Sequence, residues 1–191
     1  RKVFHPLPYD THMKLYLITL FSLLSIGSVQ SQTVEVNDHS YPKSENVYDT
    51  EWILQGTHHF KYKIFFSVFT GAYYQAAQAD GERLVFTYTR DIEAEGLREQ
   101  AMKHLKATQS DEVLKSYASL TEQLQNAYED VSDGDTYAIT VLPEKGIWLD
   151  RNDKTVFHSD NADFGDWYLD IWLGDPPIDK GLKKDLLTTN H

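Results

Sequence analysis

The chain contains no cysteine, and this absence excludes several kinds of site at once. Without thiols there is no disulfide, no thiolate metal ligand, no cysteine nucleophile and no lipid-anchored cysteine at a cleavage site. An exported protein of this kind must be stabilised by packing alone. The sequence also lacks a GxSxG motif, a phosphate-binding loop, a dinucleotide fingerprint and a zincin motif. Hydrolase, kinase and dehydrogenase functions therefore have no support in it.

Long apolar runs are scarce as well. The longest, LYLITLFSLLSI at residues 15–26, follows Met13 and Lys14 and precedes small and polar residues. This layout is typical of a secretory signal peptide, and we expect cleavage near Ser31, with Val29 three positions before the cut. The run is too short for a comfortable membrane span, although an uncleaved anchor is the alternative. After cleavage we expect no integral membrane span.

The segment before Met13, RKVFHPLPYDTH, has no periodicity and contains two prolines. We interpret residues 1–12 as an upstream non-native extension, because Met13 is the expected initiator of the signal peptide. The predicted organisation is thus an extension at residues 1–12, a signal peptide at residues 13–31 and one domain at residues 32–191. The predicted location is the periplasm or the cell exterior.

Basic residues are few, 18 against 29 acidic ones, which gives a formal net charge of -11. Beyond residue 31 the balance is 15 basic against 28 acidic residues. Such a surface repels phosphate backbones, so we expect no nucleic-acid partner. It also argues against docking on anionic membranes, and solubility is the simplest explanation of the charge. Hydrophobic residues, by contrast, make up 41% of the chain, enough for the core of one domain.

Hydrophobic periodicity predicts a mixed fold. Period-two patterns predict strands, which we place at residues 33–36, 51–54, 61–74, 83–89, 136–142, 147–149 and 155–158. Residues 37–46 are expected to form a loop, Gly71 a possible bulge, and residues 151–154 a tight hairpin turn.

Period-3.6 patterns predict helices after the caps Asp91 and Ser110, over residues 162–173, and after Asp179. The second of these helices is expected to continue to about residue 129. Strands grouped apart from helices indicate an α+β fold, with a large antiparallel sheet and helices packed on one face.

Four stretches, taken in order, carry a family resemblance. They are IFFSVFTGAYY at residues 64–74, RLVFTYTRDI at residues 83–92 with LRE at residues 97–99, Gly134-Asp135 followed by Gly146-Ile147, and IWLGDPPID at residues 171–179. Together they resemble the chalcone isomerase-like family, in particular its bacterial secreted members, over about residues 53–187. The resemblance implies an open-faced β-sandwich with a cleft between a long strand and the helices. In plant enzymes of the family this cleft binds a flavonoid precursor, and in plastid relatives it binds a fatty acid.

The catalytic groups that the resemblance implies are missing. The plant enzymes of the family catalyse an intramolecular cyclisation of this precursor. The reaction needs a cation beside the developing enolate, and the family supplies an arginine just before the long strand. Here that segment, GTHHFKYK at residues 56–63, has no arginine, and Lys61 lacks the planar fork of a guanidinium. By the same resemblance, Leu97 stands at the place of the catalytic tyrosine, and Val68 near that of a threonine. The catalytic residues are therefore unknown.

We predict a non-catalytic binder of a small hydrophobic or fatty-acid-like ligand, without a cofactor. In this prediction Lys61 pairs with a ligand carboxylate. The cleft would be lined by Phe65, Phe69, Tyr73, Tyr88, Leu97 and Trp172. The simpler alternative is that these rings fill the core. The alternative function is an isomerase, an intramolecular lyase in which Lys61, His58, His59 and Tyr88 replace the missing groups.

A metal site could be formed by His58 and His59 together with His104 or an acidic partner. Adjacent residues on a strand point to opposite faces, and no spaced ligand motif is present, so no metal site is predicted. A series of aspartates at helical spacing follows at residues 160, 163, 166 and 170. Because the glycine-containing calcium loop is absent, we expect a solvated acidic helix face. The sequence does not predict an oligomeric state.

Overall fold

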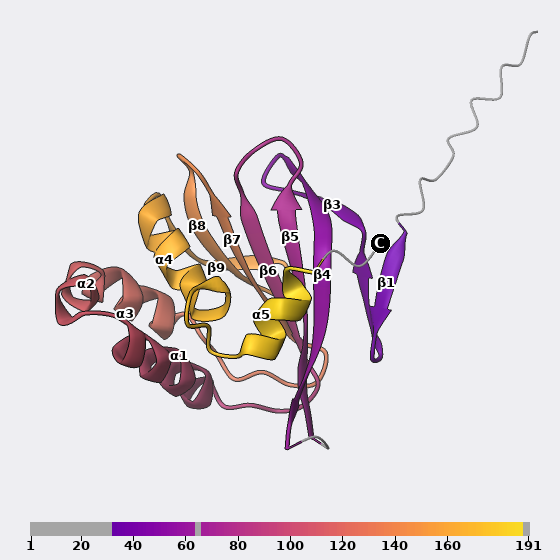
Figure 1. Cartoon of the computed structure of the whole chain (residues 1–191), viewed down its shortest axis with the longest axis horizontal. Coiled ribbons are helices and arrows are strands. Elements are labelled where there is room, and N and C mark those ends of the chain that lie inside the picture. Colours follow the sequence, from indigo (N-terminus) through magenta and orange to yellow (C-terminus); the bar gives the residue numbers. More distant parts are fainter. Residues whose placement is uncertain (1–31, 64–65, 189–191) are drawn as a thin grey trace, which may run out of the picture. The chain divides into compact units, whose positions relative to one another are not determined.

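A seven-stranded antiparallel sheet with helices on one face forms the body of the protein (Figure 1). The computed structural model describes residues 32–63 and 66–188. The strands are β1 (Thr33–Val36), β2 (His39–Pro42), β3 (Ser44–Val47), β4 (Thr50–Tyr62), β5 (Phe66–Ala76), β6 (Glu82–Tyr88), β7 (Thr136–Leu142), β8 (Gly146–Arg151) and β9 (Lys154–Ser159). The helices are α1 (Ala94–Thr108), α2 (Asp111–Ser116), α3 (Ala118–Asn126), α4 (Ala162–Leu173) and α5 (Lys180–Leu186). The predicted extension and signal peptide, and Phe65, lie outside the described residues.

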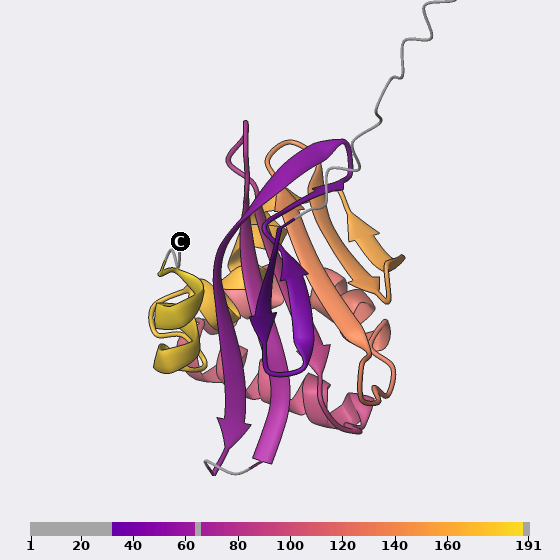
Figure 2. The same ribbon diagram turned by 90° about the vertical axis from the view of Figure 1, so that its right-hand side faces the viewer.

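The sheet follows the chain: its strand order is β3-β4-β5-β6-β7-β8-β9, and each strand is antiparallel to the next. The hairpin of β1 and β2 forms a separate small sheet. Figures 1 and 2 show the helices on one face of the curled large sheet and the β1–β2 hairpin on the other. The predicted α+β fold, an open-faced β-sandwich, is confirmed.

Alternation along the strands divides the core into two clusters. On β6, Leu84, Phe86 and Tyr88 face the helices, whereas Arg83 and Thr87 face the opposite side. The cluster under the helices is the larger one and contains buried side chains from all of α1, α3, α4 and α5. The cluster on the other face is covered by β1–β3.

Two of the strand predictions were wrong. The predicted loop at residues 37–46 contains β2 and most of β3. The predicted single strand at residues 61–74 is a hairpin: β4 ends at Tyr62, Lys63 turns with φ of 49°, and β5 begins at Phe66. The arms have the same aromatic composition, and the turn has no glycine or proline to mark it.

The predicted bulge at Gly71 was also wrong. Gly71 pairs regularly with His58, and the register shifts of the β4–β5 pair lie between Leu54 and Gly56 and between Phe60 and Lys61.

The helix predictions needed two corrections. Asp91 does not cap α1: the helix begins at Ala94, whose N–H donates to Oδ1 of Asp130 at 2.8 Å. The helix predicted from Ser110 to residue 129 is broken at Tyr117 into α2 and α3. The caps Ser110 and Asp179 are confirmed, and α4 has the predicted bounds.

The helices differ in how closely they pack against the sheet. Helix α4 lies against β7 and β8, and α5 lies against β4 and β5. Two glycines permit this approach: a Cβ on Gly165 would lie 2.9 Å from the methyl groups of Val141, and one on Gly56 would collide with the backbone carbonyl oxygens of Asp185 and Leu186. By contrast, the main neighbours of α1 are α2 and α4. Figure 1 shows α1–α3 grouped outside α4.

Candidate functional site

Four aromatic rings from both layers make a continuous cluster on the helix-covered face, which we call the aromatic cluster. It consists of Phe60, Phe69, Phe86 and Trp172. Phe60 stacks on its strand partner Phe69 at 4.9 Å between ring centroids, Phe69 meets Phe86 edge-on at 5.2 Å, and Phe86 lies 5.4 Å from Trp172. Phe86 is buried, whereas the other three rings are only partly buried. The cluster therefore runs from the core to the surface.

A second group of rings, the tyrosine cluster of Tyr88, Tyr128, Tyr137 and Tyr168, adjoins the first. Tyr88 lies 6.3 Å from Phe69, and Tyr168 lies 5.8 Å from Trp172. Burial raises the pKa of Tyr88, Tyr128 and Tyr168 well above the usual value for tyrosine. These phenols stay neutral at ordinary pH and can donate or accept hydrogen bonds without adding charge to the interior.

The contact between α3 and α4 leaves polar atoms without partners. Nε2 of Gln125 donates to the Tyr168 hydroxyl at 2.8 Å, and the hydroxyls of Tyr128 and Tyr168 lie 3.4 Å apart. Within the described residues, however, Oε1 of Gln125, Oγ1 of Thr121 and Nε1 of Trp167 have no hydrogen-bond partner although they are buried. A contact with unsatisfied buried polar atoms is weaker than one in which every group is paired.

The structure brings only part of the predicted binding set together. Phe69, Tyr88 and Trp172 belong to the two ring clusters, and Leu97 packs on their edge from α1. Tyr73 lies apart from these rings: its hydroxyl donates to Oε1 of Glu82 at 2.6 Å.

Lys61 stands away from the clusters. It is exposed, and because it follows Phe60 on β4, its side chain points to the face of the strand opposite to that of Phe60. Phe65 cannot be placed, since it lies outside the described residues.

The groups required for a cyclase do not converge. Arg83 is buried on the face away from the helices, where Nε lies 2.8 Å from Oε1 of Glu45. Arg98 on α1 pairs with Glu95 and donates to the backbone carbonyl of Tyr128. No arginine in the described part of the chain contacts a phenol of the tyrosine cluster.

The two neighbouring histidines point to different partners. Nδ1 of His58 lies 2.8 Å from Oδ2 of Asp185 on α5, and Nε2 of His59 lies 2.8 Å from Oγ of Ser67 on β5. The described residues hold no group of three or more His, Asp or Glu arranged for a metal ion. The His58–Asp185 pair instead borders the aromatic cluster, with 6.4 Å between the rings of His58 and Phe60.

The acidic series on and before α4 is solvent-exposed, as predicted for a solvated face. Asp160, Asp163, Asp166 and Asp170 are all exposed. Partial desolvation, followed by the charges of Asp163 and Asp170, raises the pKa of Asp166 above its ordinary value.

Sequence reasoning missed Phe60, Phe86 and the His58–Asp185 pair as parts of the site. Phe60 could have been found from alternation, since it lies two residues after His58 on one strand face. Asp185 could not, because 127 residues separate it from His58 and only the docking of α5 joins them.

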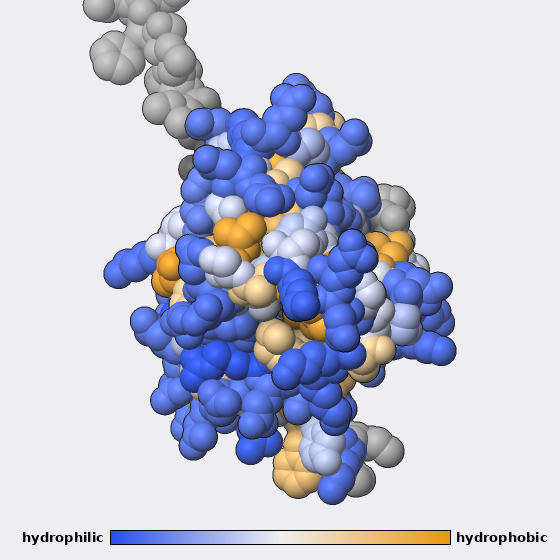
Figure 3. Space-filling model, turned by 90° about the vertical axis from the view of Figure 1, so that its left-hand side faces the viewer, coloured by the Kyte–Doolittle hydropathy of each residue, from blue (hydrophilic) through white to orange (hydrophobic). Residues whose placement is uncertain are grey.

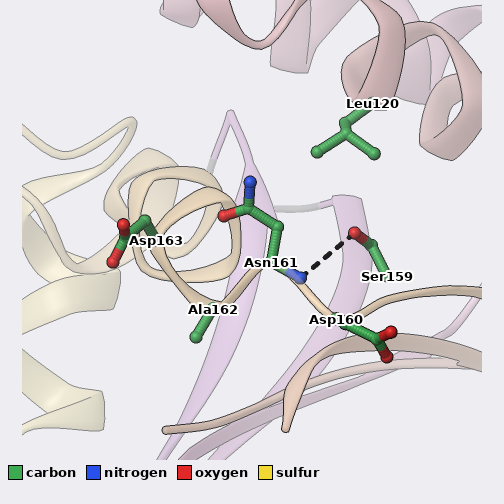
Figure 4. Close-up of a pocket in the computed structure, with 6 residues that line it drawn as sticks. All are labelled: Leu120, Ser159, Asp160, Asn161, Ala162 and Asp163. Carbon is green, nitrogen blue, oxygen red and sulfur yellow. Dashed lines mark hydrogen bonds between the residues drawn. The ribbon is translucent and has the colours of Figure 1, made fainter. Parts of the chain in front are cut away.

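The surface hollows of the described region are shallow and polar. One is lined by Leu120, Ser159, Asp160, Asn161, Ala162 and Asp163. In Figure 4 its two carboxylates point away from each other on either side of Asn161, whose N–H donates to Oγ of Ser159 at 3.3 Å. The other lies around the β5–β6 connection and Pro143. Neither hollow is lined by a residue of the aromatic cluster. Figure 3 shows apolar surface on this side only as small separate patches.

Three comparisons with known proteins bear on the identity of the fold. A fatty-acid binding protein from Arabidopsis thaliana, known from its crystal structure, is similar with a TM-score of 0.61 and 14% sequence identity, over 82% of this chain and 96% of that one. A search of the curated proteins found no match. None of the helices in residues 32–63 and 66–188 is long and apolar enough to cross a membrane. The family model described as chalcone isomerase-like matches residues 33–188, nearly the whole described region, and the chain therefore belongs to the chalcone isomerase-like family.

Proposed function

We propose that this protein binds a small hydrophobic ligand of the fatty-acid type between its sheet and its helices, without catalysing a reaction, in the periplasm or outside the cell. The observation that carries the proposal is the aromatic cluster, in which Phe60, Phe69 and Trp172 are partly exposed and continuous with the buried core. An apolar path from surface to interior is what a lipid chain requires. The fold shared with a fatty-acid binding protein supports this class of ligand, and the signal-like residues 13–31 support export.

The ligand would have to open its own space, because neither surface hollow includes a residue of the aromatic cluster. In this proposal α1–α3 are the part that moves, since the contacts of α1 are mainly with α2 and α4, and α3 meets the sheet mainly at the edge strand β9. The acyl chain would replace the contacts that Phe69 and Leu97 make with their neighbours. Each buried methylene contributes about 0.8 kcal/mol, so a chain of ten or more carbons can offset the cost of parting the layers.

The polar end of the ligand would stay at the surface. The polar groups described in the interior beside the aromatic cluster, among them the phenols of the tyrosine cluster and the amide of Gln125, are neutral, and a buried carboxylate without a cation costs several kcal/mol. The rim next to Phe60 carries the imidazole of His58, held by Asp185. We therefore place the acyl chain inward and the head group beside His58.

Native mass spectrometry of the protein purified from its own host tests the proposal. We expect a bound species with the mass of a fatty acid, and uptake of added fatty acids after delipidation. Trp172→Ala should weaken uptake at least tenfold. Trp148→Ala is the matched control, because Trp148 is also partly buried but stacks with Tyr48 and His158 on the opposite face of the sheet. Protein that is always empty, or equal losses in both variants, would contradict the proposal.

Two further measurements follow from the same proposal. Ligand binding should slow hydrogen exchange in α1–α3 and leave α4 unchanged, because only the first group has to move. Incubation with a chalcone should show no rate above the uncatalysed one, since no arginine in residues 32–63 and 66–188 contacts the phenols. A clear acceleration would favour the isomerase instead.

A further inference from the structure

The hairpin of β4 and β5 extends beyond the rest of the sheet. Strand β6 pairs with β5 as far as Phe69, and the N–H of Thr89 just after it donates to the carbonyl oxygen of Val68, whereas β4 continues to pair with β5 through Lys61–Ser67 and Tyr62–Phe66. At about 3.3 Å per residue, the two residues after Phe60 on β4 carry this two-stranded end roughly 7 Å past the last paired position of β6. Figures 1 and 2 both show β4 and β5 ending below the helices and the other strands.

The projecting end carries the two most exposed large apolar side chains of the described region. Tyr62 is 56% exposed and Phe66 is 54% exposed, and the two residues are direct partners across the hairpin. An isolated exposed ring is common on protein surfaces, but two paired rings at the tip of a projection make a small apolar platform.

Two lysines flank this platform. Lys61 and Lys63 are both exposed, and neither forms an ion pair within the described residues. Nζ of Lys63 lies 5.2 Å from the centroid of the Tyr62 ring. The tip is thus cationic in a protein whose net charge is -11.

The whole-molecule charge does not decide how this tip behaves. Charges are screened over about 8 Å at physiological ionic strength, so an approaching surface responds most strongly to the charges nearest to it. An anionic surface that meets the tip first therefore interacts with Lys61 and Lys63 more strongly than with the acidic residues on the body. Repulsion between the anionic surface and the acidic residues of the body then orients the protein with the hairpin end toward the surface.

We propose that the end of the β4–β5 hairpin docks on the surface of an anionic lipid bilayer. Tyr62 and Phe66 insert at the level of the head groups, where aromatic side chains are favoured, and the two lysines contact anionic phosphates. The next pair of aromatic residues along the hairpin, Phe60 and Phe69, begins the aromatic cluster, so the docked tip is close to the apolar path. The proposal stands independently of the ligand, because docking requires only the tip.

The absence of cysteine allows a position-specific test in the full chain. An environment-sensitive dye is attached to a single thiol, introduced by Phe66→Cys or, as the control, by Val156→Cys on β9 at the opposite edge of the sheet. The probes are phospholipid vesicles with 30% anionic lipid and a lipid-borne quencher. We expect quenching at position 66 and none at position 156. Equal quenching at both positions, or none at 66, overturns the proposal, and the local readout separates the tip from any contribution of residues 15–26.

Charge variants test the same surface without a label. Lys61→Gln with Lys63→Gln should lower partitioning onto the anionic vesicles about 30-fold, as two lysine contacts would. The matched control is Lys180→Gln with Lys184→Gln, two exposed lysines on α5 whose loss changes the net charge equally. If both pairs weaken binding to the same extent, net charge and not the tip governs adsorption, and the proposal fails. Failure here with fatty-acid uptake intact leaves the proposed ligand unaffected.

Discussion

Helices α4 and α5 differ from α1–α3 in how they meet the rest of the protein. The first pair sits directly on the sheet, at points where Gly56 and Gly165 remove the side chain that would keep the backbones apart. The second group has fewer direct contacts with the sheet, the main one being that of α3 with β9, and its contact with α4 contains buried polar atoms without partners in the described region. Helices α4 and α5, one half of the helix layer, are therefore closely docked on the sheet. Helices α1–α3, the other half, are held by contacts that a ligand could replace.

This difference places the candidate site at the border of the two halves. The aromatic and tyrosine clusters combine rings from the sheet and from α4 with Tyr128 just after α3. A ligand that enters between two layers needs one layer that stays in place and one that can move. Ligand-binding elements are commonly among the less stable parts of a fold. The predictions below test whether the two halves differ in this way.

The largest effect is expected for Gly56→Ala. Its Cβ would collide with the backbone carbonyl oxygens of Asp185 and Leu186, and backbone atoms cannot move aside as a flexible side chain can. Helix α5 must then lift from β4, exposing Leu182 and Leu186, which are almost fully buried. We expect a loss of about 3 kcal/mol in the free energy of unfolding by urea titration. An unchanged midpoint would mean that α5 does not dock as described.

Tyr168→Phe should cause the next largest loss in the free energy of unfolding, because it removes a hydrogen bond at the border of the two halves of the helix layer. Nε2 of Gln125 would lose its partner, at a cost of about 2 kcal/mol near neutral pH. Tyr62→Phe on the exposed hairpin tip is the control and should be neutral.

The same variant has a pH signature. Burial raises the pKa of the folded Tyr168 phenol above the 10.0 of an unperturbed tyrosine. The stability that this phenol contributes is complete below pH 10 and is lost as pH rises through the higher folded value. Denaturation midpoints measured between pH 9 and 11.5 should therefore fall less steeply in Tyr168→Phe than in the wild type. Parallel slopes would contradict a buried phenol.

Gly165→Ala should cost less, about 1 kcal/mol. The added Cβ meets the methyl groups of Val141 at 2.9 Å, and overpacking of this kind costs about 2 kcal/mol. Replacing glycine inside a helix returns roughly 1 kcal/mol of helix propensity. Thermal unfolding followed by circular dichroism measures the balance, and a stabilised variant would show that α4 is less closely docked than α5.

Gly96→Ala in α1 should change the stability least, and it should stabilise the protein where the other variants destabilise it. The nearest atom to its added Cβ is Cγ2 of Ile92 at 3.8 Å, an ordinary contact. Only the gain in helix propensity remains, so we expect stabilisation by roughly 0.5 to 1 kcal/mol in the same thermal experiment. Destabilisation comparable to that of Gly165→Ala would erase the distinction between the two halves.

Much of the fold could be predicted from local patterns, and the failures have identifiable causes. Helix α4 has the bounds that its hydrophobic periodicity predicted, and the structure shows that Asn161 caps its start and Gly174 follows its last residue. The β4–β5 hairpin was missed because Lys63 makes a left-handed turn that the sequence does not mark with glycine. The break at Tyr117 was missed because the apolar stripe continues through it, and only the three-dimensional path of α2 and α3 reveals the bend.

The candidate site was less predictable than the fold. Aromatic composition pointed to Phe69, Tyr88 and Trp172, but strand alternation had to be applied in the correct hairpin before Lys61 could be assigned to the other face. Pairs such as His58 with Asp185 depend on tertiary docking, which no local pattern encodes.

The order of the strands has a consequence for how the protein is made. Each strand of the large sheet pairs with the strand synthesised just before it. Five of the six pairings close through short connections, which favours rapid folding, whereas β6 and β7 are separated by α1–α3. Helix α5 is the last of the described elements along the chain, and it packs against β4 near the start of the domain. The face of β4 that receives α5 therefore stays uncovered until residues 180–186 have been synthesised.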